Sequence, residues 1–214
     1  MLVKERMSQP VITVNPDMPI MEALALMKSE RIRRAPVVAD GKMLGIVSEK
    51  DLLNAGPSDA TSLSVWEANY LVSRIKVRDV MTKKVLTVDE DTPIEEAARI
   101  MADNKVGGLP VTRAGEVVGV ITETNLFRVF LELMGAREKG VRATVLAPEK
   151  RGSLASITQA VAEAGGNFIA FGQFYGENPS NRLLTFKVVG LDEAQMRTLI
   201  APLVEAIVDI RTTG

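Results

Sequence analysis

The chain has 214 residues, of which 46% are hydrophobic and 25% charged, a composition typical of a folded protein of one or two domains. Its 26 basic and 27 acidic residues give a net charge of −1, which together with only 4% aromatic residues argues against a nucleic-acid partner. With 0 His and 0 Cys, the chain has no disulfides, no zinc site built on nitrogen or sulfur, and no nucleophilic catalysis that needs either residue.

The N-terminal segment MLVKERMSQP lacks the apolar stretch of a secretory signal. No apolar run approaches the roughly 18 residues that a membrane-spanning helix needs. We therefore expect a cytoplasmic protein without a membrane partner.

The chain contains an internal duplication. Residues 7–54 recur without a gap at residues 81–128, so that matched positions are 74 apart, and 16 of the 48 pairs are identical. Two copies are too few for a solenoid, which needs about three or more units. We expect one compact domain with pseudo-twofold symmetry, with any ligand bound between the copies.

Each copy is predicted to fold as β-α-β-β-α. Residues 11–14 read as a short strand, and the following helix is expected to begin after a cap at Asp17 in the first copy and Thr92 in the second. A hairpin follows, with the turn at Asp40-Gly41, and Gly45 marks a close approach of the backbone. Apolar positions at helical spacing predict the buried faces: Ile20, Ala23, Leu24 and Met27 in the first copy, and Ile94, Ala97, Ala98 and Met101 in the second.

Between the copies lies an insertion, which begins with the loop Gly56-Pro57-Ser58-Asp59 and continues as a helix. Trp66 and Tyr70 lie one turn apart on this helix, where packing is the more common role and contact with a ligand or second subunit the alternative. Acidic residues between 89 and 96 surround the start of a helix, where negative charge favours the helix dipole. Binding of Mg²⁺ there is the alternative, and we expect no metal site.

From Val141 the pattern changes to β-α-β-β-α-β. A strand at 141–147 leads to a helix that ends at Gly165-Gly166-Asn167. Strands at 168–175 and 183–189 are followed by a helix that Pro202 should end, and by a last strand near 207–211. The buried face of the first of these helices is predicted to comprise Leu154, Ile157, Val161 and Ala164.

The phrases RRAPVVADGKMLGIVSEKDLL, VMTKKVLTV and VGGLPVTRAGEVVGVITETNLF resemble the cystathionine-β-synthase (CBS) domain, which normally occurs as a tandem pair. The resemblance implies that the segment before the Pro offers backbone groups to an adenine. It also implies that a Ser/Thr-x-x-Asp motif holds phosphate with its hydroxyl and ribose with its carboxylate. The nucleotide-binding residues implied in this way are Ser8, Arg33, Arg34, Ala35, Pro36, Ser48 and Asp51 in the first copy, and Thr82, Gly108, Leu109, Pro110, Thr122 and Asn125 in the second.

The residue chemistry is consistent with this resemblance, although Ser48 and Asp51 also fit a helix cap with its N3 partner. The copies differ, because Arg33-Arg34 in the first is replaced by Gly107-Gly108 in the second. One site gains cations that suit phosphates and the other gains space. Asn125 replaces the expected Asp, so that full ribose recognition is not expected in the second copy.

The segment RGSLASITQAVAEAGGNF resembles the ACT domain, a ferredoxin-like regulatory module that pairs through its sheet and often binds amino acids. The usual Asp of its ligand loop is absent, which favours a purely dimerising role. The residues available to an amino acid are Gly152, Ser153, Leu154 and Asn167.

The expected fold is thus mixed α/β (α+β), with a first CBS copy at 1–56, a helical insertion at 57–78, a second copy at 79–134 and an ACT-type domain at 141–214. This order resembles that of acetoin-utilisation-type CBS–ACT proteins. It predicts a non-enzymatic, regulatory homodimer that senses AMP, ADP, ATP, NAD(H) or S-adenosylmethionine and acts on a partner enzyme. The alternatives are a ligand-independent dimerisation module and a carboxylate-dependent enzyme.

Overall fold

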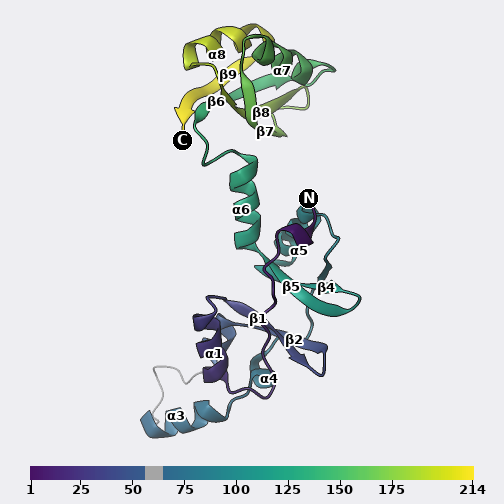
Figure 1. Ribbon diagram of the computed structural model, residues 1–214, viewed down its shortest axis with the longest axis vertical. Coiled ribbons are helices and arrows are strands. Elements are labelled where there is room, and N and C mark those ends of the chain that lie inside the picture. Colours follow the sequence, from purple (N-terminus) through teal and green to yellow (C-terminus); the bar gives the residue numbers. More distant parts are fainter. Residues whose placement is uncertain (56–64) are drawn as a thin grey trace. The chain divides into compact units, whose positions relative to one another are not determined.

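The computed structural model describes residues 1–55 and 65–214, and its elements are labelled in Figure 1. The chain divides into two compact units, Met1–Leu126 and Phe127–Gly214. Within the described residues, no helix is both long and apolar enough to cross a membrane. The predicted loop at Gly56-Pro57-Ser58-Asp59 lies outside the described residues.

The first unit contains both copies of the repeat. The first copy comprises α1 (Ile20–Ser29), β1 (Arg34–Ala39), β2 (Lys42–Ser48) and α2 (Glu49–Asn54). The second comprises β3 (Val88–Asp89), α5 (Ile94–Asn104), β4 (Gly108–Arg113), β5 (Glu116–Thr122) and the start of α6 (Glu123–Leu133). A short turn of 3₁₀ helix, η1 (Val3–Glu5), precedes the first copy, and α3 (Val65–Arg74) and α4 (Val77–Val80) precede the second.

The predicted hairpins are confirmed. β1 and β2 pair antiparallel around Asp40 and Gly41, which both have positive φ, as do Ala114 and Gly115 in the second copy. The predicted first strand is present only in the second copy, where Val88–Asp89 pairs with β4. In the first copy the equivalent segment makes a single bridge between Val14 and Val37.

The predicted helix stripes form the core. Ile20, Ala23, Leu24 and Met27 are buried, as are Ile94, Ala97 and Met101. The predicted caps are wrong, because Pro19 and Pro93 precede the helices and no side chain caps either one. Instead, the amide of Ile20 donates to the carbonyl oxygen of Ile75 at 3.1 Å, and the amide of Ile94 donates to the carbonyl oxygen of Met1 at 3.2 Å.

These two contacts belong to a reciprocal exchange. The 3₁₀ turn η1, which precedes the first copy, binds the second, since the amides of Val3 and Lys4 donate to carbonyls of Thr92 and Glu90. Helix α4, which precedes the second copy, binds the first copy through the equivalent pair of hydrogen bonds. The amide of Val77 donates to the carbonyl of Met18, and the amide of Arg78 donates to the carbonyl of Pro16. Each copy is therefore completed by the segment that precedes the other.

Helix α3 is present as predicted, but its two aromatic residues do not pack against the core as expected. Trp66 is 87% exposed and Tyr70 61% exposed. The guanidinium of Arg74 lies over the Tyr70 ring, 5.5 Å from its centroid, and donates to its hydroxyl. The helix contacts the core instead through Val72, with Ile75 following it.

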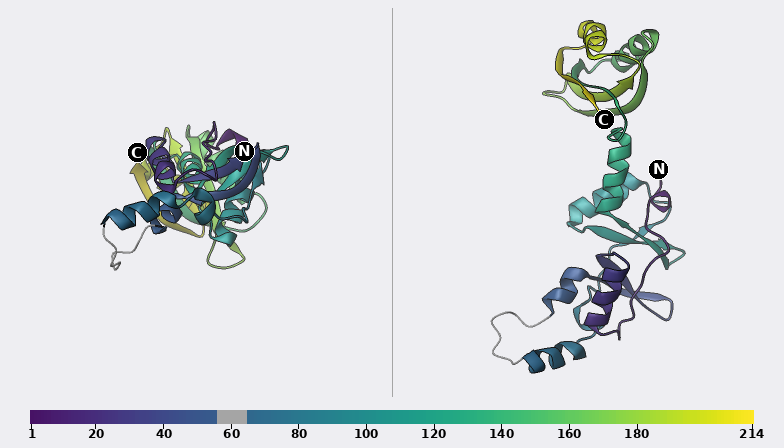
Figure 2. Two further views of the ribbon diagram at one scale, coloured as in Figure 1. Left: turned by 90° about the horizontal axis from the view of Figure 1, so that it is seen from below. Right: turned by 60° about the vertical axis from the view of Figure 1, so that its left-hand side comes forward.

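The second unit has the predicted order β-α-β-β-α-β. Its elements after α6 are β6 (Gly140–Pro148), α7 (Ser153–Glu163), β7 (Asn167–Tyr175), β8 (Asn181–Val189), α8 (Glu193–Ile200), the turn η2 (Ala201–Leu203) and β9 (Ala206–Thr213). The strands form one antiparallel sheet in the order β7-β8-β6-β9. Helices α7 and α8 cover one face of this sheet (Figure 2).

The core of this unit lies between sheet and helices, where Ile157 and Val161 of α7 meet Phe186 of β8 and Met196 of α8. The predicted stripe extends too far at both ends, since Leu154 is 41% exposed and Ala164 is the exposed C-cap. The predicted helix end is confirmed by the amide of Gly166, which donates to the carbonyl of Val161, and by Gly165 at φ +86°. Helix α8 ends before Pro202, as expected.

The opposite face of the sheet carries a buried ammonium. Lys187 is only 3% exposed, and its Nζ donates to the carbonyl of Gly135 at 2.9 Å and to that of Glu138 at 2.7 Å. The segment 135–140, which precedes β6, is thus tied to the sheet. Next to it, the hydroxyls of Thr144 and Thr185 share a hydrogen bond of 3.0 Å.

Candidate functional site

The residues that the CBS resemblance implied meet at one end of each hairpin. In the first hairpin Arg34 lies opposite Ser48 and Pro36 opposite Ile46. In the second hairpin the same register places Gly108 opposite Thr122, Leu109 opposite Ile121 and Pro110 opposite Val120. Ala35 and Leu109 are buried, so that both Pro segments are held by the core and their backbones are fixed.

Ser8 and Thr82 approach the hairpin of the opposite copy. Thr82 bridges Ile46 of β2 with two backbone hydrogen bonds of 2.9 Å, and Ser8 bridges Val120 of β5 with bonds of 2.9 and 3.2 Å. Each candidate site therefore combines a hairpin of one copy with the segment that precedes the other. The sequence interpretation included Ser8 and Thr82 among the nucleotide-binding residues, and the structure places each of them against the hairpin of the opposite copy.

Gly45 is the sequence signal that marked this crossing. A Cβ atom at Gly45 would lie 2.7 Å from the carbonyl oxygen of Thr82 and 2.8 Å from Sδ of Met81. At the equivalent Gly119, a Cβ would lie 2.5 Å from Sδ of Met7 and 3.1 Å from the carbonyl oxygen of Ser8. The predicted close approach is thus an approach between the two copies.

Ser48 and Asp51 form a capping box at the start of α2. The Ser48 amide and hydroxyl donate to Oδ2 of Asp51 at 2.8 and 2.6 Å, and the Asp51 amide donates to the Ser48 hydroxyl at 3.3 Å. Oδ1 of Asp51 takes no hydrogen bond from another described residue. Because the side chain is only partly buried, this oxygen remains able to accept a hydrogen bond from a hydroxyl of a ligand.

Thr122 and Asn125 form the equivalent cap at the start of α6, but here both the oxygen and the nitrogen of the Asn125 side-chain amide are hydrogen-bonded. Oδ1 of Asn125 accepts from the amide and hydroxyl of Thr122 at 2.9 and 2.5 Å. Its Nδ2 donates to the carbonyl oxygen of Arg6 at 2.9 Å, a bond that an aspartate cannot make. Asn125 is buried, so that both polar ends of its side chain are already satisfied within the protein. The difference between Asn and Asp thus separates the two sites.

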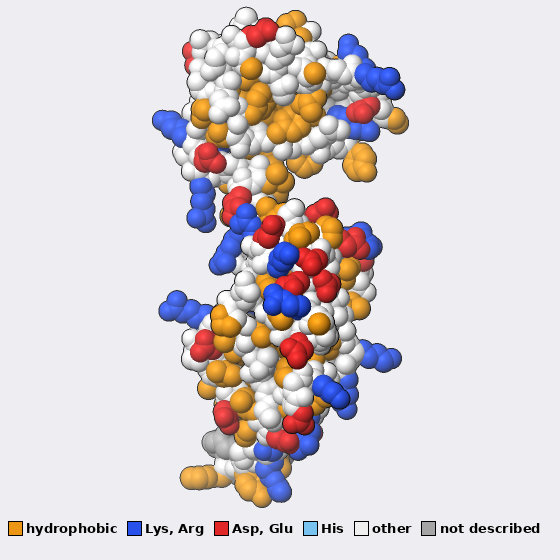
Figure 3. Space-filling model, turned by 45° about the vertical axis from the view of Figure 1, so that its right-hand side comes forward, with side chains coloured by type: hydrophobic (Ala, Val, Ile, Leu, Met, Phe, Trp, Pro, Cys, Tyr) orange, Lys and Arg blue, Asp and Glu red, His pale blue; other side chains and the backbone are white. Residues whose placement is uncertain are grey.

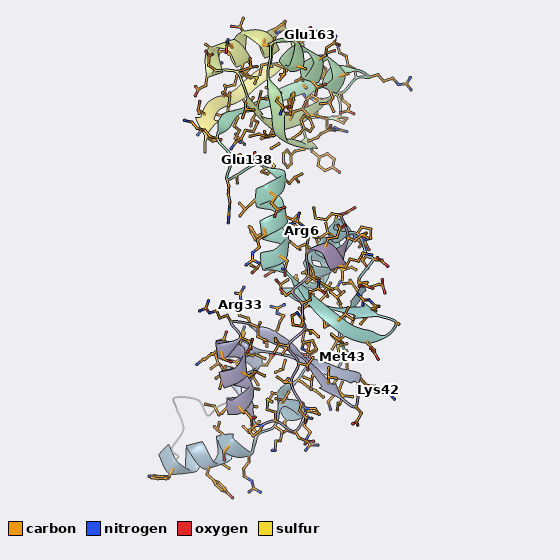
Figure 4. All side chains as sticks on the ribbon, in the orientation of Figure 1. Arg6, Arg33, Lys42, Met43, Glu138 and Glu163 are labelled. Atoms are coloured by element: carbon orange, nitrogen blue, oxygen red, sulfur yellow. The ribbon has the colours of Figure 1, made fainter. Side chains whose placement is uncertain are left out.

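The two arginines of the first copy reach the second. Arg33, which directly precedes β1 and is labelled in Figure 4, donates from Nη2 to the hydroxyl of Thr124 at 3.4 Å. The guanidinium of Arg34 lies against Gly107 and Gly108, where a Cβ would come within 2.7 and 2.9 Å of its nitrogens. The sequence interpretation placed the arginines and the glycines in different sites. In the structure, Arg34 lies against Gly107 and Gly108.

Three of the acidic residues at 89–96 pair with basic side chains. Glu90 binds Arg113 through both oxygens, Asp91 binds Lys4 at 2.6 Å, and Glu96 binds Arg99. The Arg113 hydrogen bond holds the pKa of Glu90 below its ordinary value. Acidic and basic side chains alternate on this unit in Figure 3. No group of three metal-ligating side chains is close enough to hold a metal within the described ranges 1–55 and 65–214.

The candidate amino-acid site of the second unit is not assembled within one chain. Gly152, Ser153 and Leu154 lie at the N-terminal end of α7, where the Ser153 hydroxyl donates to the carbonyl of Pro148 at 2.7 Å. Asn167 begins β7 after the other end of α7, which at 1.5 Å per residue is about 16 Å away. The length of the helix thus separates Asn167 from the other three candidate residues within one chain.

A duplicated α/β module with a Ser/Thr motif at the end of each hairpin is the architecture of a tandem binding pair. The family model described as "CBS domain" matches residues 3–58 and 77–132, two segments that are again 74 positions apart. The chain belongs to the CBS domain family. A CBS domain-containing protein of Dictyostelium discoideum is 31% identical over 135 residues, which cover 62% of this chain and 93% of that protein.

Solved structures show the same pair. CBSX2 in complex with AMP is 32% identical, covers 62% of this chain and 97% of that one, and has a TM-score of 0.52. The CBS pair of protein MJ0100, in complex with 5′-methylthioadenosine and S-adenosyl-L-methionine, is 29% identical, covers 61% and 99%, and has a TM-score of 0.51. A candidate acetoin utilization protein (AcuB) from Vibrio cholerae is 28% identical, covers 64% and 95%, and has a TM-score of 0.53.

Some relatives that share the pair are enzymes. An inosine-5′-monophosphate dehydrogenase of Thermoplasma acidophilum is 33% identical over 117 residues, but these residues make up only 21% of that protein. The shared part is therefore a minor portion of the enzyme. An enzymatic activity does not follow from the match.

Proposed function

We propose that this chain is a cytoplasmic regulatory protein that binds an adenine nucleotide or adenosyl compound at its CBS pair. The observation that carries the proposal is Oδ1 of Asp51, which accepts no hydrogen bond from the described residues and lies next to a Ser48 hydroxyl at the start of a helix. This arrangement suits a ribose diol and a neighbouring phosphate. The relatives bound to AMP, S-adenosylmethionine and methylthioadenosine support the ligand class.

A panel of AMP, ADP, ATP, NAD(H) and S-adenosylmethionine tests the proposal on the full chain. A ligand at 100 times its Kd stabilises the unit that binds it by about 2.7 kcal/mol per site, which a thermal shift detects. The proposal fails if no member of the panel raises the melting temperature and calorimetry shows no heat of binding.

The two motifs provide a matched pair of variants. Asp51→Ala should weaken binding about tenfold to a hundredfold, since it removes charge-assisted hydrogen bonds of about 1.5–3 kcal/mol. Asn125→Ala should affect affinity less, because the Asn125 amide is already bonded to Thr122 and Arg6. Its larger effect should be on stability. A greater loss of affinity in Asn125→Ala, with folding intact, would reverse the assignment of the ribose site.

We further propose that residues 141–214 form an ACT-type dimerisation unit, on the basis of the β-α-β-β-α-β order and the antiparallel sheet. Strand β7 is an edge strand and ends in Phe174 and Tyr175, which are 46% and 91% exposed. Both features suit pairing with a second copy. Analytical ultracentrifugation should show a homodimer, and Tyr175→Asp should weaken it. A monomer at high micromolar concentration would contradict this proposal.

A ligand-independent dimerisation module is the second candidate function. The internal hydrogen bonds of both motifs, and above all the satisfied Asn125, favour it. A protein that dimerises but ignores the whole nucleotide panel would support this candidate. We infer a regulated enzyme partner only if the chain binds a nucleotide. The same condition applies to the link with acetoin use that the AcuB similarity suggests.

A further inference from the structure

The sheet of the second unit carries a row of three cations on the face that α7 and α8 do not cover (Figure 2). Arg142 of β6 lies directly opposite Lys187 of β8 on one side and directly opposite Arg211 of β9 on the other. Residues that lie opposite each other in a sheet project to the same face. Like charges in such a row repel, so the row costs stability unless anions compensate it.

One carboxylate binds this row within the described residues. Arg211 donates to both oxygens of Asp209 at 2.6 to 2.9 Å, and Arg142 donates to Oδ2 of the same carboxylate at 3.2 Å. The ammonium of Lys187 is bound by two backbone carbonyl oxygens, which accept its hydrogen bonds but carry no net charge. Three cations and one carboxylate leave an excess of two positive charges.

Glu193 of α8 does not remove this excess. It lies near enough to Arg211 to act on its charge. Its carboxylate, however, accepts hydrogen bonds from the amide and the hydroxyl of Thr212 at 2.7 and 2.6 Å. Because successive residues of a strand point to opposite faces, Thr212 projects to the face that the helices cover. Glu193 is therefore held on the other side of the sheet from the row.

A shallow depression of about 490 Å³ lies over the same part of the sheet, and it is lined by Arg142, Thr144, Val208, Asp209, Arg211 and Thr213. Its arginines have donors to spare, since Nη2 of Arg142 and Nη1 of Arg211 bind no other described residue. The hydroxyl of Thr213 is buried without a hydrogen-bond partner among the described residues. A buried hydroxyl without a partner is costly, so its presence in the wall of this depression is a second sign of a missing acceptor.

We propose that this depression binds a small dianion, a phosphate or a dicarboxylate, through Arg142 and Arg211. Arginine suits both groups because its planar guanidinium donates two parallel hydrogen bonds to an oxyanion. The excess of two positive charges favours a dianion over a monoanion. Asp209 holds the two arginines in place but repels the ligand, so it limits the affinity. The site uses no residue of the CBS pair or of the start of α7, and it does not depend on nucleotide binding.

An NMR titration of the ¹⁵N-labelled full chain with inorganic phosphate, succinate and acetate, at constant ionic strength, tests this site. A dianion should shift the amide signals of residues 140–144 and 208–213 to saturation. Acetate should bind about tenfold more weakly or worse, because it lacks the second charge-assisted contact. A response to phosphate alone or to succinate alone identifies which kind of dianion the site takes. The proposal is overturned if neither dianion gives saturable shifts in these segments, or if acetate binds equally well.

Two variants of opposite sign separate anion binding from a structural role. Arg211→Gln should weaken binding of the dianion about tenfold or more. Asp209→Asn should strengthen it severalfold, because the repelling carboxylate is removed, and this gives a reading even if Arg211→Gln folds poorly. Arg197→Gln removes the same charge from α8 of this unit and should leave the affinity unchanged. Equal losses in Arg211→Gln and Arg197→Gln, or weaker binding in Asp209→Asn, contradict the proposal.

Discussion

Gly45→Ala should break the contact between the two copies. The new Cβ would lie 2.7 Å from the carbonyl oxygen of Thr82, a backbone atom that cannot move unless the chain around it moves. The two hydrogen bonds of 2.9 Å between Ile46 and Thr82 would then be lost or distorted. At about 0.5–1.5 kcal/mol each, their loss should cost the first unit about 1–3 kcal/mol.

Gly119→Ala is the matched control for this change. The nearest atom to its Cβ is Sδ of Met7, which belongs to a flexible side chain, and the backbone oxygen of Ser8 lies farther away at 3.1 Å. Both variants gain the same benefit from replacing Gly in a strand, so that this term cancels in the comparison. We therefore expect Gly45→Ala to be more destabilising than Gly119→Ala.

Calorimetry on the full chain, with the transitions of the two units separated, measures the cost of each change. Hydrogen exchange at the amides of Ile46 and Thr82 should be faster in Gly45→Ala than in the unmodified chain. If the two variants are equally stable, or if these amides remain protected, the close approach does not hold the copies together.

Two further predictions concern buried or paired charges. Lys187→Met should lower the melting temperature of the second unit, because it removes the hydrogen bonds to Gly135 and Glu138 at a cost of about 2 kcal/mol or more; an unchanged transition would contradict this role. Glu90→Gln should reduce stability at pH 7 but not in acid. Because Arg113 lowers the pKa of Glu90 in the folded state, their pairing stabilises the fold above the ordinary carboxyl pKa and is lost as pH falls through the lowered value. Urea unfolding of both chains between pH 7 and pH 3 checks this, and a stability difference independent of pH would refute it.

Local chemistry explains the elements that the sequence predicted well. The hairpin turn at Asp40-Gly41 needs positive φ at both residues, and the helix end at Gly165 needs it at one, so that residue type alone indicates the structure. The apolar stripe from Ile20 to Met27 likewise reports burial through its spacing. These signals lie within a few residues of the feature that they predict.

Several predictions failed because they depended on contacts with segments far along the chain. Asp17 has the chemistry of a cap, yet the carbonyl of Ile75 already accepts the first amide of the helix. The exposure of Trp66 shows that an aromatic pair one turn apart does not by itself mark the packed face of a helix. Arg34 and Gly108 could be compared as equivalent positions in the sequence, but only the folded pair shows that they touch.

The reciprocal exchange of η1 and α4 has a consequence for how such a chain arises and folds. A protein with one copy could make the same contacts only by trading N-terminal turns with a second molecule, at a strength set by its concentration. Joining the copies in one polypeptide replaces that concentration with an effective one, which is set by the length and stiffness of the connection. The duplication thus turns an association between molecules into an internal folding step, and the first unit should unfold as one cooperative body rather than as two halves.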